Sequence, residues 1–251
     1  MSWQLIEYNT YSGKYNMEFD LQLVKNCSEN EAYLRFYGWE PHCISLGANQ
    51  SYDDINLVLA TINNIDVVKR PTGGRAILHS DELTYSVVMP NNKQLSGRTI
   101  YEKISEAIII GLVKYDSMLE KVMLENQQPN FQQLLSQPSG SLCFASTAKS
   151  EIKFEGKKLV GSAQRKLGNT ILQHGSILIG PNHKSLIDYL NLDEELKLNL
   201  QNEMEMKTTE ISTILNKHVN ILELQKNIVF GFNKIFNSQL SINEFSSLPT
   251  L

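Results

Sequence analysis

The sequence predicts an α+β fold, in which a mixed or antiparallel β-sheet is flanked by helices. Three observations lead to this class. Residues 151–179 are rich in β-forming residues and contain two turn signals, Glu155-Gly156 and Gly168-Asn169. Segments with helical periodicity lie both before and after this region. Strands and helices do not alternate strictly along the chain, as they would in a sheet built from βαβ units.

Five segments have the pattern of helices. Residues 13–25 place Met17, Leu21 and Val24 on one face. The pair Thr99 and Glu102 has the spacing of a capping box, so a helix should follow it. Further helices are expected over 184–190, 210–215 and 222–236. The apolar stripe expected on the helix after Thr99 consists of Ile104, Ala107, Ile108, Leu112 and Tyr115.

The expected strands are short and bounded by turn residues. They cover residues 33–37, 43–46, 66–69, 83–89, 152–154, 159–160 and 171–179. Residues 125–140 are rich in Gln, Pro and Ser, which indicates a long, mobile loop.

Composition and charge exclude several classes of protein. The chain has 251 residues, of which 41% are hydrophobic, and a formal net charge of −4. Lys and Arg are not in excess, so the charge does not indicate binding to nucleic acid or to an anionic membrane surface. The N-terminus lacks the features of a signal peptide, and no apolar run approaches the roughly 18 residues of a membrane span. We therefore expect a cytoplasmic protein.

A pair of glycines marks a candidate binding loop. Gly73 and Gly74 lie between the strand-like run 66–69 and an apolar run that ends at His79. Glycines at such a place let the main chain approach a ligand, because no Cβ intervenes. Arg70 and Arg75 can meet a negatively charged or carbonyl-bearing group. The pattern lacks both Gly-x-Gly-x-x-Gly and the Gly-Lys-Ser/Thr ending of a phosphate-binding loop, so it predicts no nucleotide site.

Cys143 and Lys158 are candidate catalytic residues, although residues of these types in such places more often have a structural role. A lone cysteine is more often a small buried apolar residue than a nucleophile, and a strand lysine is usually solvated. A lysine folded back against Cys143 would supply the positive charge that favours a thiolate. The small residues Gly161, Ser162 and Ala163 leave room for a ligand, although tight packing explains them equally well.

The cysteines and histidines fit no metal site. Cys27, Cys43 and Cys143 cannot all pair with one another, and free thiols in a reducing compartment are the simplest interpretation. No spacing matches a zinc motif, so no metal is expected. His79 and His174 each interrupt an apolar run, and a single histidine there is more often structural than catalytic.

Taken together, these blocks resemble the biotin/lipoate protein ligase-like superfamily, most closely its Gram-positive-type octanoyltransferase branch. The resemblance extends from Trp3 to about Ile179 and more loosely into the C-terminal helices. The matching blocks are Asn16-Met17 with Asp20, and residues 35–39, 70–86, 143–144, 155–158, 161–164 and 171–178.

The resemblance implies a fold, an activity and a set of site residues. It implies one class II biotin/lipoyl protein ligase-like catalytic domain over residues 1–251, helical from about residue 184, acting as a monomer without a cofactor. Such a domain moves an octanoyl group from octanoyl-acyl carrier protein, through a thioester on Cys143, to a lysine of a lipoyl-domain protein such as glycine cleavage H protein. Lys158 aligns with the active-site lysine of the superfamily. The implied substrate-binding residues are Arg70, Gly73, Gly74, Arg75, His79, Gly161, Ser162, Ala163, His174 and Gly175.

Three alternatives stay open: an amidotransferase between carrier domains, an ATP-dependent lipoate ligase, and a catalytically silent acyl- or carrier-binding module. Ligases of this superfamily typically carry a third glycine where this chain has Arg75, and they lack a cysteine at the position of Cys143. Both differences favour a transferase. Residues 147–150 depart from the pattern of close relatives, which usually have a proline there, so the geometry beside Cys143 and the acyl or carrier preference stay open.

Overall fold

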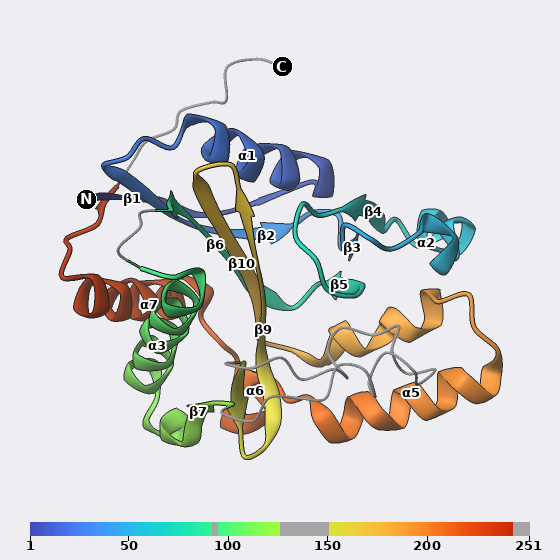
Figure 1. Ribbon diagram of the computed structural model, residues 1–251. Helices are drawn as coiled ribbons and strands as arrows, with labels where there is room; N and C mark the ends of the chain where they lie inside the picture. Colours follow the sequence, from blue (N-terminus) through green and yellow to red (C-terminus); the bar gives the residue numbers. More distant parts are fainter. Residues whose placement is uncertain (92–94, 126–150, 243–251) are drawn as a thin grey trace.

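The structure is a computed structural model that describes residues 1–91, 95–125 and 151–242. Its centre is an eight-stranded sheet in the order β11–β1–β2–β6–β10–β9–β8–β7 (Figure 1). Strand β1 runs parallel to β2 and β11, and the other neighbouring pairs are antiparallel. The strands are β1 (Ser2–Tyr11), β2 (Glu31–Trp39), β6 (Glu82–Pro90), β7 (Val122–Leu124), β8 (Ile152–Phe154), β9 (Lys157–Leu167), β10 (Thr170–Leu178) and β11 (Ser241–Ile242). The predicted α+β class with a mixed sheet is confirmed.

A second, three-stranded sheet lies beside the first. Strand β3 (Cys43–Leu46) is its centre, parallel to β4 (Asp66–Lys69) and antiparallel to β5 (Ile77–His79). The 3₁₀ helix η1 (Tyr52–Asp54) and helix α2 (Leu57–Ile62) connect β3 to β4. The glycine loop, defined here as residues 70–75, connects β4 to β5.

Helices cover both faces of the large sheet. Helix α1 (Gly13–Asn26) packs Phe19 and Leu23 against β2, β6 and β10 on one face. Helices α3 (Gly97–Tyr115) and α7 (Ile221–Phe236) cover the other face, where they pack closely against each other. A Cβ at Gly231 of α7 would lie 2.0 Å from the carbonyl oxygen of Ala107 in α3, so only glycine permits this approach.

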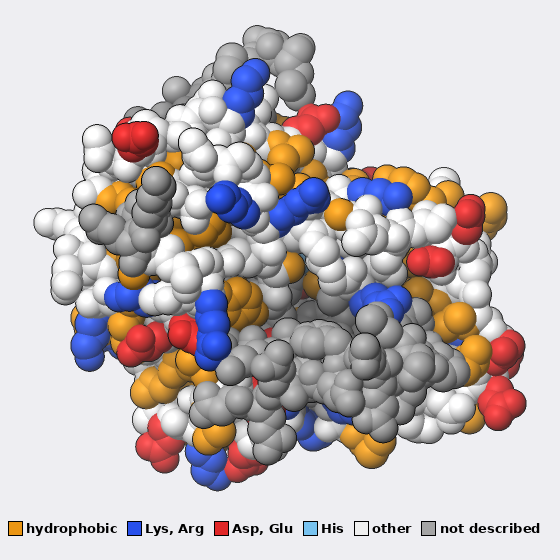
Figure 2. Space-filling view, in the orientation of Figure 1, with side chains coloured by type: hydrophobic (Ala, Val, Ile, Leu, Met, Phe, Trp, Pro, Cys, Tyr) orange, Lys and Arg blue, Asp and Glu red, His pale blue; other side chains and the backbone are white. Residues whose placement is uncertain are grey.

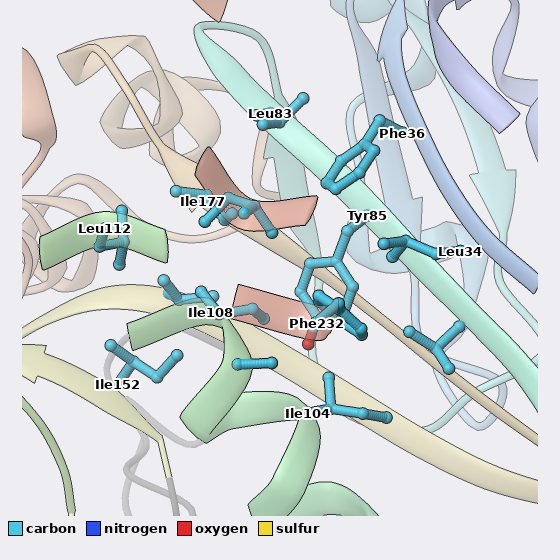
Figure 3. Packing of buried hydrophobic residues seen from close by; sticks show 14 of the residues in the cluster. Leu34, Phe36, Leu83, Tyr85, Ile104, Ile108, Leu112, Ile152, Ile177 and Phe232 are labelled. Atoms are coloured by element: carbon cyan, nitrogen blue, oxygen red, sulfur yellow. The ribbon is translucent and has the colours of Figure 1, made fainter. Parts of the chain in front are cut away.

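The main hydrophobic core lies between the large sheet and these two helices. Figure 3 shows Leu34, Phe36 and Tyr85 from the sheet facing Ile104 and Ile108 of α3 and Phe232 of α7. The predicted stripe on α3 supplies four of the buried core residues, and Tyr115 at its end is partly buried. The remaining elements are η2 (Ser117–Lys121), between α3 and β7, and η4 (Pro181–Tyr189), α5 (Glu194–Lys207) and α6 (Ile211–Leu215), between β10 and α7.

Three sequence-based expectations are corrected. Helix α3 begins at Gly97 with Ser96 as its N-cap, because the Ser96 hydroxyl accepts the Thr99 amide; Glu102 pairs with Arg98 instead of closing a capping box. Residues 184–190 are not α-helical, since most of them lie in the 3₁₀ helix η4. Strand β1 and helices α2 and α5 were not expected. The predicted loop over 125–140 lies outside the described residues except for Glu125.

Within the described ranges, the helices are too short or too polar to cross a membrane.

Candidate active site

A cavity lies between the two sheets, beside the start of α1. Eight of the predicted site residues line it. They are Arg70, His79, Lys158, Gly161, Ser162, Ala163, His174 and Gly175. Gly73, Gly74 and Arg75 are not among the described residues of its wall, and both glycines are exposed. Cys143 lies outside the described residues, so its position relative to the cavity stays a prediction.

Lys158 is buried in the cavity wall and is not the solvated strand residue that its sequence context suggests. Its residue exposure is 4%, and its Nζ lies 2.7 Å from Oε1 of Glu151. A buried ammonium is costly without an anionic partner, and Glu151 provides one. Glu151 also lines the cavity and immediately precedes β8. A fixed positive charge therefore borders the cavity.

His79 is fixed on all sides at the edge of the cavity. Its Nδ1 lies 2.8 Å from Oε1 of Glu82, and its Nε2 lies 2.7 Å from Oγ of Ser45. Its ring stacks on Trp39 with the centroids 4.1 Å apart, and the Trp39 indole donates to Oγ1 of Thr84. This packing leaves His79 a single orientation.

Glu82 is the buried carboxylate at the centre of this group. Its Oε1 accepts from the hydroxyl groups of Thr84 and Ser176 as well as from His79. Burial alone would raise the pKa of the Glu82 carboxyl, but the His79 contact and these hydroxyl donors hold it below its ordinary value. Glu82 is therefore an acceptor-only carboxylate at neutral pH, and Nδ1 of His79 carries a proton.

Arg70 holds the glycine loop from within. Its Nη1 donates to the carbonyl oxygen of Ser45 at 2.8 Å, and its Nη2 donates to the carbonyl oxygens of Gly73 and Arg75 at 3.0 and 2.6 Å. Gly47 lies behind the loop, where an added Cβ would be 2.0 Å from the Gly74 carbonyl oxygen. The guanidinium thus binds main chain of its own loop, in addition to facing the cavity.

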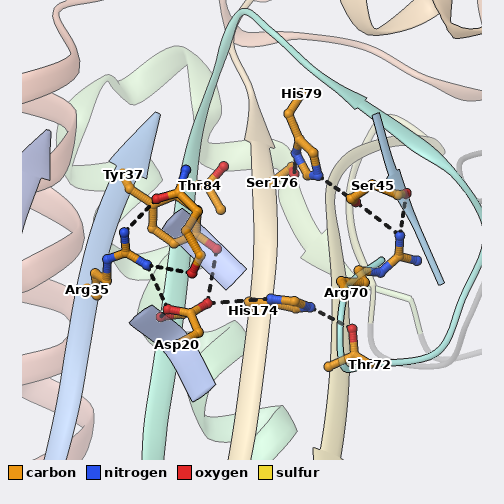
Figure 4. Close-up of polar contacts among 12 residues, drawn as sticks. Asp20, Arg35, Tyr37, Ser45, Arg70, Thr72, His79, Thr84, His174 and Ser176 are labelled. Atoms are coloured by element: carbon orange, nitrogen blue, oxygen red, sulfur yellow. Dashed lines mark hydrogen bonds and ion pairs between the residues drawn. The ribbon is translucent and has the colours of Figure 1, made fainter. Parts of the chain in front are cut away.

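A second buried carboxylate, Asp20 of α1, lies beside Arg35 and His174 (Figure 4). It accepts from Arg35 at 2.8 Å, and from the hydroxyls of Ser86 and Tyr37 at 2.9 and 3.1 Å. Burial would raise the pKa of Asp20, but the Arg35 guanidinium and His174 keep it below its ordinary value. Asp20 is therefore ionised at neutral pH.

His174 connects Asp20 to the glycine loop. Its Nδ1 lies 3.8 Å from Oδ2 of Asp20, and its Nε2 lies 2.6 Å from Oγ1 of Thr72. Burial lowers the pKa of His174, although Asp20 opposes this shift, so the ring is neutral at neutral pH. The neutral ring places its proton on Nδ1, toward the carboxylate, and accepts the Thr72 hydroxyl at Nε2.

The small residues of β9 and β10 form a closely packed wall. Ser162 pairs with Gly175 across these strands. A Cβ at Gly175 would meet the Gly161 carbonyl oxygen at 2.6 Å and Oγ of Ser162 at 2.7 Å. Tight backbone packing therefore accounts for Gly175, and the Ser162 hydroxyl is bonded to Tyr85 at 2.7 Å.

Sequence reasoning missed several residues of this site. Glu82, Thr72, Asp20 and Arg35 fell within recognised blocks but were given no role, and Ser45 and Glu151 were not considered for the site. Glu151 could have been found, because the Glu155-Gly156 turn pairs β8 with β9 and brings residue 151 back toward the strand of Lys158. In the described part of the chain, no group of three His, Cys, Asp or Glu side chains is placed to hold a metal ion.

Comparisons with known proteins identify the family of the chain. The family model of the lipoyl protein ligase A/B catalytic domain matches residues 12–233. The octanoyltransferase LipM of Clostridioides difficile is 33% identical over 94% of this chain and 87% of its own length. The protein of the same name from Bacillus subtilis is also 33% identical, over 98% of this chain and 90% of its own length.

Solved structures share the fold. A lipoate-protein ligase A bound with ATP covers 97% of this chain and 89% of its own, with a TM-score of 0.76 at 18% identity. A bipartite lipoate protein ligase from Thermoplasma acidophilum gives the same TM-score and identity, covering 97% of this chain and 87% of its own. These likenesses confirm the predicted fold, and the sequence matches show that the chain belongs to the lipoyl protein ligase A/B catalytic domain family.

Proposed function

We propose that this protein transfers an octanoyl group from octanoyl-acyl carrier protein, through a thioester on Cys143, to a lysine of a lipoyl-domain protein such as glycine cleavage H protein. The observation that carries the proposal is the buried ammonium of Lys158 in the wall of a cavity, in a chain similar over nearly its whole length to octanoyltransferases.

Two acyl transfers make up the reaction. The Cys143 thiolate attacks the carbonyl carbon of the donor thioester, a new C–S bond forms, the old one breaks, and the donor sulfur leaves as a thiolate. The acceptor lysine, as a free amine, then attacks the cysteine thioester, forms the amide and releases the Cys143 thiolate. The proton that the amine loses passes to solvent and balances the protonation of the donor thiolate. A thiolate serves well both as nucleophile and as leaving group, which divides one difficult transfer into two easier ones.

Lys158 has two tasks in this scheme. Its positive charge favours the thiolate form of a neighbouring cysteine. It also stabilises the negative charge that develops on the acyl oxygen in each tetrahedral intermediate, and it does so without rearrangement because Glu151 already holds it in place. The apolar side chains of the cavity, Met17, Trp39, Ile77 and Ala163, favour an alkyl chain over water.

Cationic side chains around the glycine loop support a carrier protein as donor. Lys69 and Arg165 are exposed, Arg75 is partly exposed, and Arg165 is fixed by donating to the Pro71 carbonyl oxygen at 2.6 Å. On the face shown in Figure 2, Lys and Arg side chains lie near the middle of the described surface, whereas Asp and Glu lie mostly toward its edges. A negatively charged carrier surface fits this distribution.

The test is an intact-mass measurement after incubation with octanoyl-acyl carrier protein. We expect one octanoyl adduct on the wild type and none on Cys143→Ala. The other two thiols provide the control: burial, and secondarily Glu31, raises the pKa of Cys27 to about 11, and burial raises the pKa of Cys43 well above normal. Cys27→Ala should therefore keep the adduct. Failure of the wild type to become acylated, or an adduct that survives Cys143→Ala, would exclude this mechanism.

The role of Lys158 has its own measurement. If Lys158 activates Cys143, the thiol should react with iodoacetamide near neutrality faster than an ordinary cysteine, and Lys158→Ala should slow it. Equal rates in both proteins would remove Lys158 from thiol activation.

An ATP-dependent lipoate ligase is the second candidate, because the fold matches a lipoate-protein ligase A bound with ATP. Formation of lipoyl-AMP from free lipoate and ATP would support it and displace the transferase. Testing octanoylated glycine cleavage H protein as donor distinguishes the amidotransferase: a cysteine adduct with that donor alone would identify transfer between carrier domains.

A further inference from the structure

Two chains of polar contacts run from the buried carboxylates of Glu82 and Asp20, each through a histidine, to the glycine loop. Figure 4 shows the part from His79 to Arg70 and the part from Asp20 to Thr72. We propose that His79 and His174 are positioning residues. Each histidine links a buried carboxylate to one part of this loop and so fixes the position of that part. The proposal deepens the function proposed above, since the loop borders the acyl site, but its first test does not need an acyl donor.

The first chain reaches the loop through Arg70. Nδ1 of His79 donates to Glu82, and in the tautomer with its proton on Nδ1 the ring accepts the Ser45 hydroxyl proton at Nε2. The Ser45 oxygen in turn accepts from Nη1 of Arg70 at 3.1 Å. The guanidinium then binds the carbonyl oxygens of the loop. With the proton of His79 on Nδ1, every donor in this chain points toward Glu82.

The second chain reaches the loop through Thr72. Asp20 faces Nδ1 of His174, and Nε2 of that ring accepts the Thr72 hydroxyl. Asp20 is itself fixed by Arg35, and Thr72 lies fully buried below the exposed glycines. The Thr72 carbonyl oxygen accepts the amide of Ala48, which ties the loop to the end of β3. The two chains start on different elements, β6 and α1, and come together only at the loop.

This arrangement argues against a direct reaction of either histidine with substrate. Both nitrogens of each ring face a protein group, and each Nε2 is occupied by a hydroxyl group. Either histidine could take a proton from a substrate amine only by giving up its hold on the loop. The same hydrogen bonds that would obstruct general base catalysis are the ones that a positioning role requires.

The test compares two substitutions at Thr72 with one at Ser86. Thr72→Val keeps the shape but removes the hydroxyl, and Thr72→Ser keeps the hydroxyl. Ser86→Ala removes a different buried hydroxyl, which binds Oδ1 of Asp20 and not the Oδ2 that faces His174. The readout is hydrogen exchange at the Ala48 amide, measured against a core amide such as that of Ile108. A merely structural role would change both amides together.

We expect Thr72→Val to speed exchange at Ala48 by about three- to tenfold relative to Ile108, the factor for losing one hydrogen bond. Thr72→Ser should restore the wild-type ratio, and Ser86→Ala should leave it unchanged. Unaltered relative exchange in Thr72→Val, or failure of serine to restore it, would overturn the proposal. Should Thr72→Val not fold, Ser45→Ala on the other chain gives the same readout with the same expected direction.

The acylation assay adds a second measurement. Thr72→Val should raise the donor concentration for half-maximal acylation while leaving the shape of the pH–rate profile unchanged, because no titrating group is removed. Loss of a limb of that profile would indicate that the His174 chain takes part in proton transfer and would contradict positioning. If the wild type accepts no octanoyl group, the proposed function fails, and the exchange experiment still decides whether the loop is held in this way.

Discussion

The ammonium of Lys158 and the carboxylate of Glu151 form an ion pair 2.7 Å long, and the two side chains are 5% and 4% exposed. Removing one partner of a buried pair leaves the other charge without compensation. We expect Glu151→Gln to lower the free energy of unfolding by about 3–5 kcal/mol, measured by urea denaturation.

The matched control is the surface pair Arg98–Glu102, whose side chains are 66% and 40% exposed. Glu102→Gln should change stability by less than about 1 kcal/mol, because solvent screens an exposed pair. Similar losses in the two variants would show that Lys158 does not depend on Glu151.

Substitution by alanine should affect stability differently at two glycines near the cavity. At Gly175 a Cβ would lie 2.6 Å from the Gly161 carbonyl oxygen, so Gly175→Ala must displace β9 and should destabilise the fold by about 1–3 kcal/mol. At Gly73 no atom of the described residues lies within 4 Å of the added Cβ, and stability should change by no more than about 0.5 kcal/mol.

Thermal unfolding of both variants checks this pair of expectations. Activity of Gly73→Ala then has a clear meaning. If acylation falls while stability is kept, the open space at Gly73 receives the donor, which is the role that the sequence suggested for the glycine pair.

Stability should fall as the solution becomes acidic, in two windows. Burial lowers the pKa of both His174 and His183 below the ordinary 6.5, so the unfolded chain binds protons more readily than the folded one as pH falls through 6.5. The pKa values of Asp20 and Glu82 are held down despite burial, that of Asp20 by Arg35 and His174 and that of Glu82 by His79 and two hydroxyl donors. They add a second loss of stability below about pH 4.5.

Urea midpoints measured from pH 8 to pH 5 test the first window. A midpoint that stays constant or rises on acidification would contradict neutral burial of the two histidines. Charging His174 should also release the Thr72 hydroxyl, so exchange at Ala48 should quicken over the same range.

Trp39 provides an optical probe of the cavity. It is buried, lines the cavity and stacks on His79, whereas Trp3 packs against α7 on the other side of the sheet. Octanoylation should change tryptophan emission in the wild type and not in Trp39→Phe. An equal signal in both proteins would mean that the acyl group lies elsewhere.

Local patterns in the sequence were sufficient for some elements and not for others. The Gly168-Asn169 turn and the flanking apolar residues predicted the β9–β10 hairpin, because its pairing is settled by residues next to one another in the chain. Strand β1 was missed because its residues have no strong alternation of their own; it is stabilised by parallel pairing with β2 and, across the length of the chain, with β11. Segment 184–190 has a helical composition, but its packing selects a 3₁₀ helix that begins at Pro181.

The candidate site shows the same limit. Glu82 is only three residues from His79, yet their contact depends on the turn between β5 and β6. Asp20 and His174 are distant in sequence and meet only after α1 has packed on the sheet. Sequence could therefore nominate both histidines, but it could not distinguish a residue that binds substrate from one that holds a loop. The burial of Lys158 was likewise not expected, because it depends on Glu151 across the β8–β9 hairpin.

Strand β6 belongs at once to the hydrophobic core and to the candidate site. Leu83, Tyr85 and Val87 face the core, while Glu82, Thr84 and Ser86 alternate with them and support the polar network around the cavity. Because neighbouring side chains share one short backbone, an inherited change on either face shifts the other. Along this strand, natural selection for a new acyl preference and selection for a durable fold therefore act on adjacent residues, and substitutions there should accumulate in compensating pairs.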